Sequence, residues 1–199
     1  TRYFQAVSRL GWRMCRAFEL HLGLDLGYFD SFMNRPTSQL RYLHYLPNAA
    51  AGNNDDQNMG AHTDYECFTL LHQTSPALQV LGASGDWLDA PPIDGTYMVN
   101  IGDMMEIWTN GAFKSNVHRV RNTGLERRSI PFFVAANYDA KVRPLRALFR
   151  NGQEAQYRSL VAGHHLTTQL MRDFAYLRAR YESQSLELDF VPTDGNPFE

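Results

Sequence analysis

Three side chains that could hold a metal ion lie in two separate stretches of the sequence. In AHTDYECFTLLHQ, residues 61–73, His62 and Asp64 stand two positions apart ahead of an apolar run. Side chains two apart on a strand point the same way, so this imidazole and carboxylate can occupy adjacent positions on one ion. His118, in KSNVHRVRN, lies inside another strand pattern and offers a third ligand. Three ligands on one face of an ion leave its other positions open.

Each of these residues also has an ordinary interpretation. A His-x-Asp pair is by itself more often a hydrogen-bonded surface pair, and a single histidine such as His118 more often fills a core or surface position. Taken together, two histidines and one carboxylate match the facial triad of non-haem iron(II) oxygenases. The remaining histidines we assign to core or surface positions: His21, His44, His72, His164 and His165.

The stretch ERRSIPFF supplies a possible anion site. On a strand Arg127 and Ser129 share one face, and Arg128 points to the other. A guanidinium beside a hydroxyl can bind a carboxylate through two hydrogen bonds. An arginine directed into a barrel needs an anionic partner, because an unpaired buried charge costs several kcal/mol. The partner could be Glu126 or Asp103, or an acidic co-substrate whose other end reaches the metal.

Helical patterns begin and end the chain. Apolar residues recur every three or four positions over residues 2–22, and Gly23 follows, which predicts an amphipathic helix. A short second helical piece comes next. Near the other end, one helical face predicts a closing helix that packs on the sheet and carries Leu166, Leu170, Phe174, Leu177 and Tyr181. The last residues, PTDGNPFE, are expected to fray.

Between the helices the pattern is that of short strands. Residues 39–47 read as a strand, and residues 48–58 as a mobile surface loop that leads to His62. GASGD and Asn110-Gly111 mark turns. Regular short strands with turns predict an antiparallel sandwich or barrel, with helices around one β-core in a single domain, residues 1–199. The other predicted strands are residues 68–73, 78–81, 87–92, 96–101, 106–110, 116–122 and 128–137.

Composition excludes some partners and leaves others open. The chain has 199 residues, of which 44% are hydrophobic and 20% charged, as in ordinary globular proteins. The net charge of -2 gives no electrostatic reason to expect nucleic acid or an anionic membrane. No apolar run is long enough to span a bilayer, so we expect a soluble protein. Cys15 and Cys67 are expected to be buried thiols in a reducing compartment, and cytoplasmic localisation is the default.

Several ordered motifs together resemble the iron(II)/2-oxoglutarate-dependent dioxygenases of the isopenicillin N synthase-like group. They are HTD at 62–64, VNIGDMMEIWTNGAFKSNVHRV at 99–120 and RRSIPFF at 127–133, and the hairpin LQVLGASGDWLDAPP is also similar. The two histidines lie 56 positions apart, a spacing the group shares. The resemblance, over roughly residues 1–181, implies a double-stranded β-helix, or jelly roll, mostly β with flanking helices.

The resemblance also implies roles for individual residues. His62, Asp64 and His118 match the ligands of Fe(II), and they would be the catalytic centre. Arg127 and Ser129 match the motif that binds the distal carboxylate of 2-oxoglutarate. The likeness extends this carboxylate site to Tyr45, and it places Asn100, Tyr65 and Phe133 around the substrate. The implied reaction uses dioxygen and 2-oxoglutarate to oxidise a small organic metabolite, usually by hydroxylation, with release of succinate and carbon dioxide.

Several alternatives stay open at this point. The iron oxidases of the isopenicillin N synthase kind keep the triad and the Arg-x-Ser motif but take no 2-oxoglutarate. A zinc hydrolase would need a general base, and Glu66 and Glu106 lie in strand patterns with no evident route to the metal. Family members usually carry a further N-terminal region before the first helix. Its apparent absence suggests a fragment or an unusually short member, and it keeps open a non-catalytic binding protein on the same scaffold.

Overall fold

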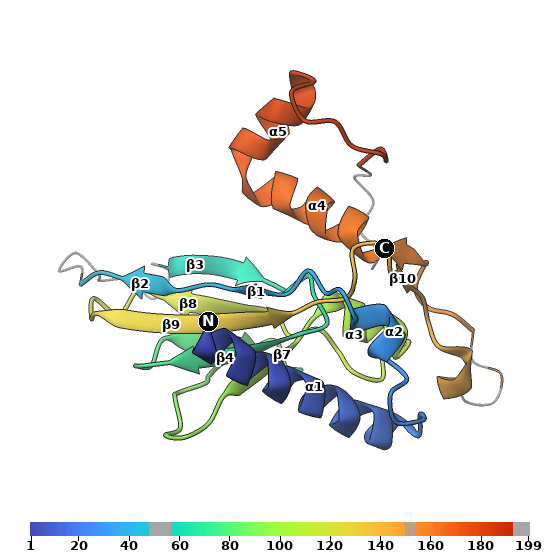
Figure 1. The fold of residues 1–199 in the computed structure, drawn as a ribbon. Helices are drawn as coiled ribbons and strands as arrows, with labels where there is room; N and C mark the ends of the chain where they lie inside the picture. The colour runs from blue at the N-terminus through green and yellow to red at the C-terminus, as the bar shows by residue number, and fades with distance from the viewer. Residues whose placement is uncertain (48–56, 150–151, 153, 193–199) are drawn as a thin grey trace.

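The computed structural model describes residues 1–47, 57–149, 152 and 154–192 (Figure 1). Two antiparallel sheets pack against each other, and helix α1 lies along the outer side of the larger sheet. The larger sheet has the order β1-β9-β4-β7, with β2 also paired to β9, and the smaller has the order β3-β8-β5-β6. This arrangement confirms the predicted jelly roll, mostly β with flanking helices.

The strands of both sheets are short, as predicted. The larger sheet contains β1 (Gln39–Leu40), β2 (Leu43–Tyr45), β4 (Phe68–Gln73), β7 (Met98–Ile101) and β9 (Arg127–Val134). The smaller contains β3 (Gln57–His62), β5 (Leu78–Leu81), β6 (Trp87–Asp89) and β8 (His118–Arg121). A separate pair joins β10 (Lys141–Val142) to β11 (Leu160–Val161).

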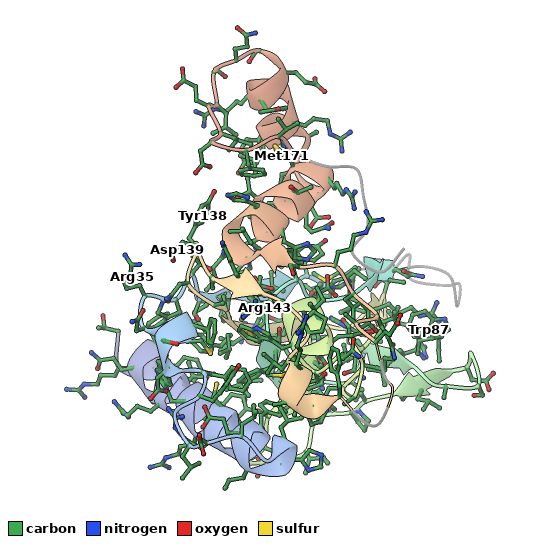
Figure 2. All side chains as sticks on the ribbon, turned by 90° about the vertical axis from the view of Figure 1, so that its right-hand side faces the viewer. Arg35, Trp87, Tyr138, Asp139, Arg143 and Met171 are labelled. Atoms are coloured by element: carbon green, nitrogen blue, oxygen red, sulfur yellow. The ribbon has the colours of Figure 1, made fainter. Side chains whose placement is uncertain are left out.

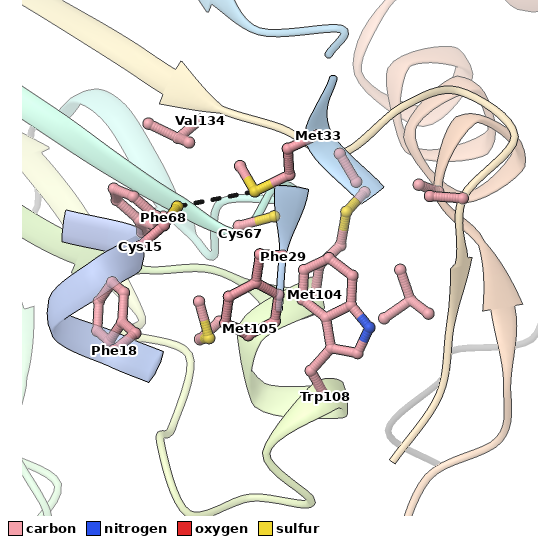
Figure 3. Close-up of a cluster of buried hydrophobic side chains, with 14 of the residues drawn as sticks. Cys15, Phe18, Phe29, Met33, Cys67, Phe68, Met104, Met105, Trp108 and Val134 are labelled. Atoms are coloured by element: carbon pink, nitrogen blue, oxygen red, sulfur yellow. Dashed lines mark hydrogen bonds between the residues drawn. The ribbon is translucent and has the colours of Figure 1, made fainter. Parts of the chain in front are cut away.

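Helix α1 (Arg2–Leu22) forms as predicted, and Gly23 ends it with a left-handed φ of 68°. Its apolar stripe packs on β9, where Gly11 lets the helix approach closely. An alanine Cβ at Gly11 would lie 3.1 Å from Val134 Cγ2. The main core lies between this helix, the larger sheet and the short helix α2 (Asp30–Met33) (Figure 3). Cys15 and Cys67 are buried free thiols in it, which confirms that part of the prediction.

A second apolar cluster fills the space between the two sheets. Leu71 comes from the larger sheet, whereas Leu78 and Val120 come from the smaller one. Tyr45 and Met59 pack at its margin, on the side where the candidate site lies. The two sheets are therefore held face to face by apolar burial.

Residues 106–110 were predicted as a strand, and this is wrong. Residues 106–108 are instead the end of helix α3 (Asp103–Trp108), all of whose residues are buried, and residues 109 and 110 form a turn. A short apolar run that is buried on every side has no polar face, so its periodicity does not separate strand from helix. The predicted turn that follows is confirmed, because Asn110 and Gly111 have φ values of 51° and 81°.

The closing helix is also different from the prediction. It is divided at Phe174, whose φ of -116° and ψ of 98° are not helical, into α4 (Ala162–Asp173) and α5 (Ala175–Glu182). Helix α5 has no buried residue, and it stands away from the sheets beyond the buried Met171 (Figures 1 and 2). The apolar face of this helix therefore does not pack on the sheet as expected.

Other differences concern the boundaries of elements. The strand expected over residues 39–47 is two short strands, the one expected over 87–92 ends at Asp89, and the structure adds a single 3₁₀ turn, η1 (Arg146–Leu148). The predicted loop 48–58 lies mostly outside the described residues, but its last two residues begin β3. The predicted frayed end also lies outside them from residue 193 onward. Across the described ranges, no helix combines the length and apolar character that crossing a bilayer requires.

Candidate active site

The structure brings His62, Asp64 and His118 together. Strands β3 and β8 are antiparallel neighbours, and their register places His62 directly opposite His118. Asp64 Oδ1 lies 4.0 Å from His62 Nε2 and 3.7 Å from His118 Nε2. One candidate ligand atom from each of the three residues lies within 4.8 Å of the other two. Three donors at these separations can converge on a single cation.

Asp64 reaches this position by a different route from the one predicted. It does not lie on a strand beside His62, because β3 ends at His62. Its segment is instead fixed by the start of α3, where the backbone N–H of Asp103 donates to Asp64 O at 2.9 Å. The N–H of Met104 likewise donates to Glu66 O at 3.2 Å. The mispredicted helix therefore positions one of the three candidate ligands.

In both histidines the backbone hydrogen bond is made by Nδ1, which leaves Nε2 as the atom available to a metal ion. The Nδ1 atom of His62 lies 2.8 Å from Gly60 O, and that of His118 lies 2.8 Å from Asn116 O. A carbonyl oxygen only accepts, so each Nδ1 carries the hydrogen and each neutral ring leaves Nε2 unprotonated. Burial lowers the pKa of His118, against the opposing charge of Asp64, and this favours the neutral ring. These are the protonation states that a metal ligand needs.

The carboxylate completes the fit to a cation. Asp64 is 5% exposed, and its Oδ2 has no hydrogen-bond partner within the described part of the chain. A buried carboxylate oxygen without a partner is costly to retain, and a bound cation would compensate it. Two imidazole nitrogens and a carboxylate oxygen are the donors expected for a ferrous ion in a facial triad.

Arg127 is a second buried group, and it has no salt bridge to any residue that the structure describes. It is 2% exposed, and its Nη2 donates to Gln73 Oε1 at 2.9 Å, while its Nη1 donates to Ser129 Oγ at 3.3 Å. Its Nε has no hydrogen bond among the described residues. Burial lowers the pKa of Arg127, although the neighbouring Tyr45 opposes this effect.

The two internal partners considered for Arg127 are both engaged elsewhere. Glu126 lies at the surface, where its carboxylate is bonded to His44 and Arg128. Asp103 accepts hydrogen bonds from Ser115 Oγ at 3.0 Å and from His165 Nε2 at 3.2 Å. The burial pattern of β9 also confirms that Arg128 points away from Arg127. Within the described part of the chain, the guanidinium of Arg127 therefore has no carboxylate partner, and its N–H groups can donate to an anion.

One cavity of about 110 Å³ is lined by the metal-ligand candidates and by the other predicted site residues except Arg127, which lies behind Ser129 and Tyr45. Ser129 and Tyr45 line it, and β2 pairs with β9 so that Tyr45 lies opposite Arg127. The Tyr45 hydroxyl is buried without a hydrogen bond in the described structure, as is that of Thr69. The residues predicted around the substrate line the same cavity, namely Asn100, Tyr65 and Phe133.

Two cavity residues were missed or dismissed in the sequence. Glu66 was judged to have no route to the metal, but it lines this cavity and is 4% exposed. Burial and the charge of Asp64 raise the pKa of Glu66 to about 7. Arg41 lines the cavity as well, and only its place in the predicted strand pattern could have drawn attention to it. Glu106, by contrast, is bonded to Lys114 and Tyr157 away from the cavity.

Helix α4 closes one side of the cavity through contacts beside the triad. Leu170 and Asp173 are among the lining residues, and the Tyr65 hydroxyl donates to Asp173 Oδ2 at 2.9 Å. His165, which was assigned to an ordinary core position, is indeed buried and packs edge-on against Tyr65. Tyr65 therefore joins the segment that carries Asp64 to α4.

Comparison with known proteins identifies the family. The model of the 2OG-Fe(II) oxygenase superfamily matches residues 36–136, about half of the chain. The chain belongs to this superfamily. Ferrous iron and 2-oxoglutarate are the metal and the co-substrate of the superfamily, and the triad and Arg127 fit them.

Relatives of this superfamily are similar over most of the chain. A 2-oxoglutarate-Fe(II) type oxidoreductase of Emericella nidulans is 39% identical over 160 residues, which cover 78% of this chain and 46% of the relative. Homoarginine-6-hydroxylase 2-ODD-233 of Oryza sativa subsp. japonica is 42% identical over 179 residues, or 86% of this chain and 55% of the relative. The chain thus spans about half the length of the curated relatives it matches.

Solved structures of similar proteins share the fold. A full-length Neurospora crassa protein, crystallised in complex with alpha-KG, has a TM-score of 0.81 at 32% identity, covering 87% of this chain and 56% of that one. A structure of the same protein with alpha-KG and thymine also has a TM-score of 0.81. The likeness confirms the double-stranded β-helix for this oxygenase chain.

Proposed function

We propose that this chain is the catalytic part of an Fe(II)- and 2-oxoglutarate-dependent dioxygenase. The reaction would be the oxidation of a small organic metabolite, by hydroxylation, with release of succinate and carbon dioxide. The observation that carries the proposal is one cavity bordered by two groups that suit ligands of opposite charge. The convergent His-Asp-His set offers the donors that a cation needs. A buried arginine beside the same cavity has no carboxylate partner among the described residues.

In this proposal His62, Asp64 and His118 hold the iron and are the catalytic centre. The bound ion would supply open coordination positions at which dioxygen and the co-substrate meet. The backbone carbonyls of Gly60 and Asn116 keep both rings in the required tautomer and orientation. Asp64 balances part of the metal charge from a buried position.

Arg127 and Ser129 are proposed to bind the distal carboxylate of 2-oxoglutarate. Tyr45 stands opposite Arg127 in the β2–β9 register, so its free hydroxyl can donate to the same carboxylate. A guanidinium already held by Gln73 is rigid, which lowers the entropy lost when the anion binds. Iron oxidases that take no 2-oxoglutarate also carry the Arg-x-Ser motif, so Arg127 and Ser129 do not separate the two functions. The position of Tyr45, together with relatives named for 2-oxoglutarate or crystallised with alpha-KG, supports the dioxygenase.

Asn100, Tyr65 and Phe133 are proposed to contact the substrate. Asn100 lies on β7 and Phe133 on β9, and both lie opposite Thr69 of β4 in the register of the larger sheet. Two relatives are named homoarginine-6-hydroxylases, and a structural neighbour was solved with thymine. We infer a small metabolite for this chain as well.

Domain organisation, partners and location are also proposals. We propose that residues 1–199 act as one domain. Its proposed partners are small molecules, and we expect it to bind neither nucleic acid nor membranes. A cytoplasmic location is proposed because Cys15 and Cys67 are free thiols, which a reducing compartment maintains.

Two pairs of variants test this function. His118→Ala should abolish iron binding, measured by titration calorimetry under nitrogen, whereas His72→Ala, at an exposed histidine of β4, should not.

Arg127→Ala should keep iron but raise the 2-oxoglutarate concentration needed for half-maximal succinate formation about 100-fold or more. The matched control is Arg128→Ala, on the outer face of the same strand. Iron binding by the His118 variant, or an unchanged 2-oxoglutarate requirement, would refute the respective assignment.

A further inference from the structure

Glu66 is a buried carboxylate that neither the iron site nor the 2-oxoglutarate site uses. It is 4% exposed and lines the cavity next to Asp64. Among the described residues it has no salt-bridge partner within 4.0 Å, unlike the other buried glutamates, Glu19 and Glu106, which pair with Arg16 and Lys114. A buried acid without such a partner lowers the stability of the folded protein, so it contributes nothing to stability that would explain its position. Its place on the cavity wall favours a role in binding a ligand instead.

Arg41 is the complementary group on the cavity wall. It is half-buried, its guanidinium lies 5.1 Å from the centre of the Phe133 ring, and its Nη2 donates to Gln39 Oε1 at 3.3 Å. No carboxylate of the described chain lies within salt-bridge distance of it. The stacked ring restricts its motion, which prepares it to bind an acceptor group.

The charges of the cavity indicate what the substrate must offer, if the proposed function holds. Ferrous iron and Arg127 formally balance Asp64 and the dianion 2-oxoglutarate. Glu66 and Asp173 then stand against Arg41 alone, so the remaining wall is acidic. Asp173 is exposed and accepts a hydrogen bond from Tyr65. Glu66 is the buried acceptor of this wall, and among the described residues it has no salt bridge, although the charge of Arg41 acts on it from a greater distance.

We propose that Glu66 selects the substrate of this oxygenase by accepting hydrogen bonds from one or more N–H groups, while Arg41 binds an oxygen acceptor of the same molecule. The substrate class is thus a small nitrogen compound that carries N–H donors and a carbonyl or carboxylate oxygen. This inference rests on the proposed function, and it goes further by naming the recognition residue and the chemistry that it recognises.

The test uses three probes of the same size: benzamidine, benzamide and benzoate. They differ in presenting a cationic N–H donor, a neutral N–H donor with an oxygen, or oxygens alone. Calorimetry measures their binding to the chain loaded with manganese(II) and 2-oxoglutarate, which permits no turnover. At least one nitrogen probe should bind about 10-fold or more tightly than benzoate, since a hydrogen bond to a charged group contributes about 1.5–3 kcal/mol. If benzamidine is the tighter probe, the preferred nitrogen group is charged. If benzamide is the tighter probe, that group is neutral.

Variants at Glu66 link any preference to this side chain. Glu66→Leu should remove the preference for nitrogen probes, and Glu66→Gln should weaken benzamidine more than benzamide. Glu182→Gln, at the exposed end of α5, is the matched control and should change none of the affinities. Binding of manganese(II) and 2-oxoglutarate, measured on every variant, shows that the site is intact.

The outcomes separate the two proposals. If the unaltered chain does not bind manganese(II) with 2-oxoglutarate, the proposed function fails. If it binds both but no nitrogen probe exceeds benzoate, or if Glu66→Leu keeps the preference, only the inference about Glu66 is overturned.

Discussion

Gly102, at the start of α3, is the position where a single added methyl group should damage the candidate iron site most directly. A Cβ built there would lie 2.3 Å from Glu66 O and 2.9 Å from Asp64 O. Both are backbone atoms, so no side-chain rotation can relieve the contact. The φ of Gly102 is -108°, which any residue adopts, so the effect of Gly102→Ala would be steric alone.

The magnitude follows from what must move. Relieving the overlap pushes the segment of Asp64 away from α3 and weakens the hydrogen bonds from Asp103 N to Asp64 O and from Met104 N to Glu66 O. Overpacking costs about 1–3 kcal/mol, and each weakened hydrogen bond adds up to about 1 kcal/mol. We expect a loss of about 2–4 kcal/mol in the free energy of unfolding. Displacing a ligand through its support should lower iron affinity about 10- to 100-fold.

Urea denaturation of the metal-free chain and calorimetric titration with iron(II) under nitrogen measure the two effects. Gly60→Ala is the matched control, because Gly60 also adjoins the triad but, among the described residues, its Cβ would meet only Gln57 Oε1, at 3.9 Å. The Gly60 carbonyl that holds His62 is kept in this variant. That variant should lose neither stability nor iron affinity. If Gly102→Ala bound iron as tightly as the control, α3 would not position Asp64 and the account of the site would be wrong.

Two further predictions concern polar groups of the cavity. Tyr45→Phe should raise the 2-oxoglutarate concentration needed for half-maximal succinate formation about 3- to 10-fold. Iron affinity and stability should not change, because the lost hydroxyl has no hydrogen bond in the described structure. A fall in iron affinity would contradict the role assigned to Tyr45. Glu66→Gln should stabilise the metal-free chain at pH 8 but not at pH 4. Burial raises the pKa of Glu66 to about 7 in the folded protein. The side chain therefore ionises more readily in the unfolded state, and the folded protein loses up to about 3 kcal/mol of stability as pH rises from about 4.5 to about 7. Urea denaturation at both pH values measures this, and a difference independent of pH would refute the raised pKa.

Local sequence patterns predicted the parts of the fold whose burial alternates in a regular way. The stripe of residues 2–22 is one-sided, and it became α1. Strand β9 alternates buried and exposed residues at its start, so Arg127 and Ser129 were placed correctly on the inner face. Where burial is uniform, as in α3, the pattern carried no such information. Helix α5 is the opposite case. None of its residues is buried, so the contact with the sheet that its apolar spacing predicted does not form.

Two features of the site could not be read from the chain because they depend on contacts between distant residues. Asp64 is held by α3, which lies about forty positions later in the chain. The two-residue spacing from His62 therefore identified Asp64 as a candidate ligand, but it did not explain how Asp64 is positioned. Glu66 resembled an ordinary strand glutamate, and no motif marks it. It stands out because it is buried and has no salt bridge among the residues that the structure describes. No local pattern shows that a charge will be left unpaired.

The alternatives for Arg127 show where sequence reasoning was sufficient and where it was not. Arg128 follows Arg127 on the strand, so the period of two alone directs it to the opposite face. Glu126 precedes the strand, and only the structure shows its carboxylate bonded to His44 and Arg128 at the surface. The fold likewise commits the carboxylate of Asp103 to Ser115 and His165. With both candidate carboxylates bonded elsewhere, Arg127 is a buried cation that has no carboxylate partner among the described residues. Glu66 is the corresponding buried anion, which has no salt bridge among the same residues.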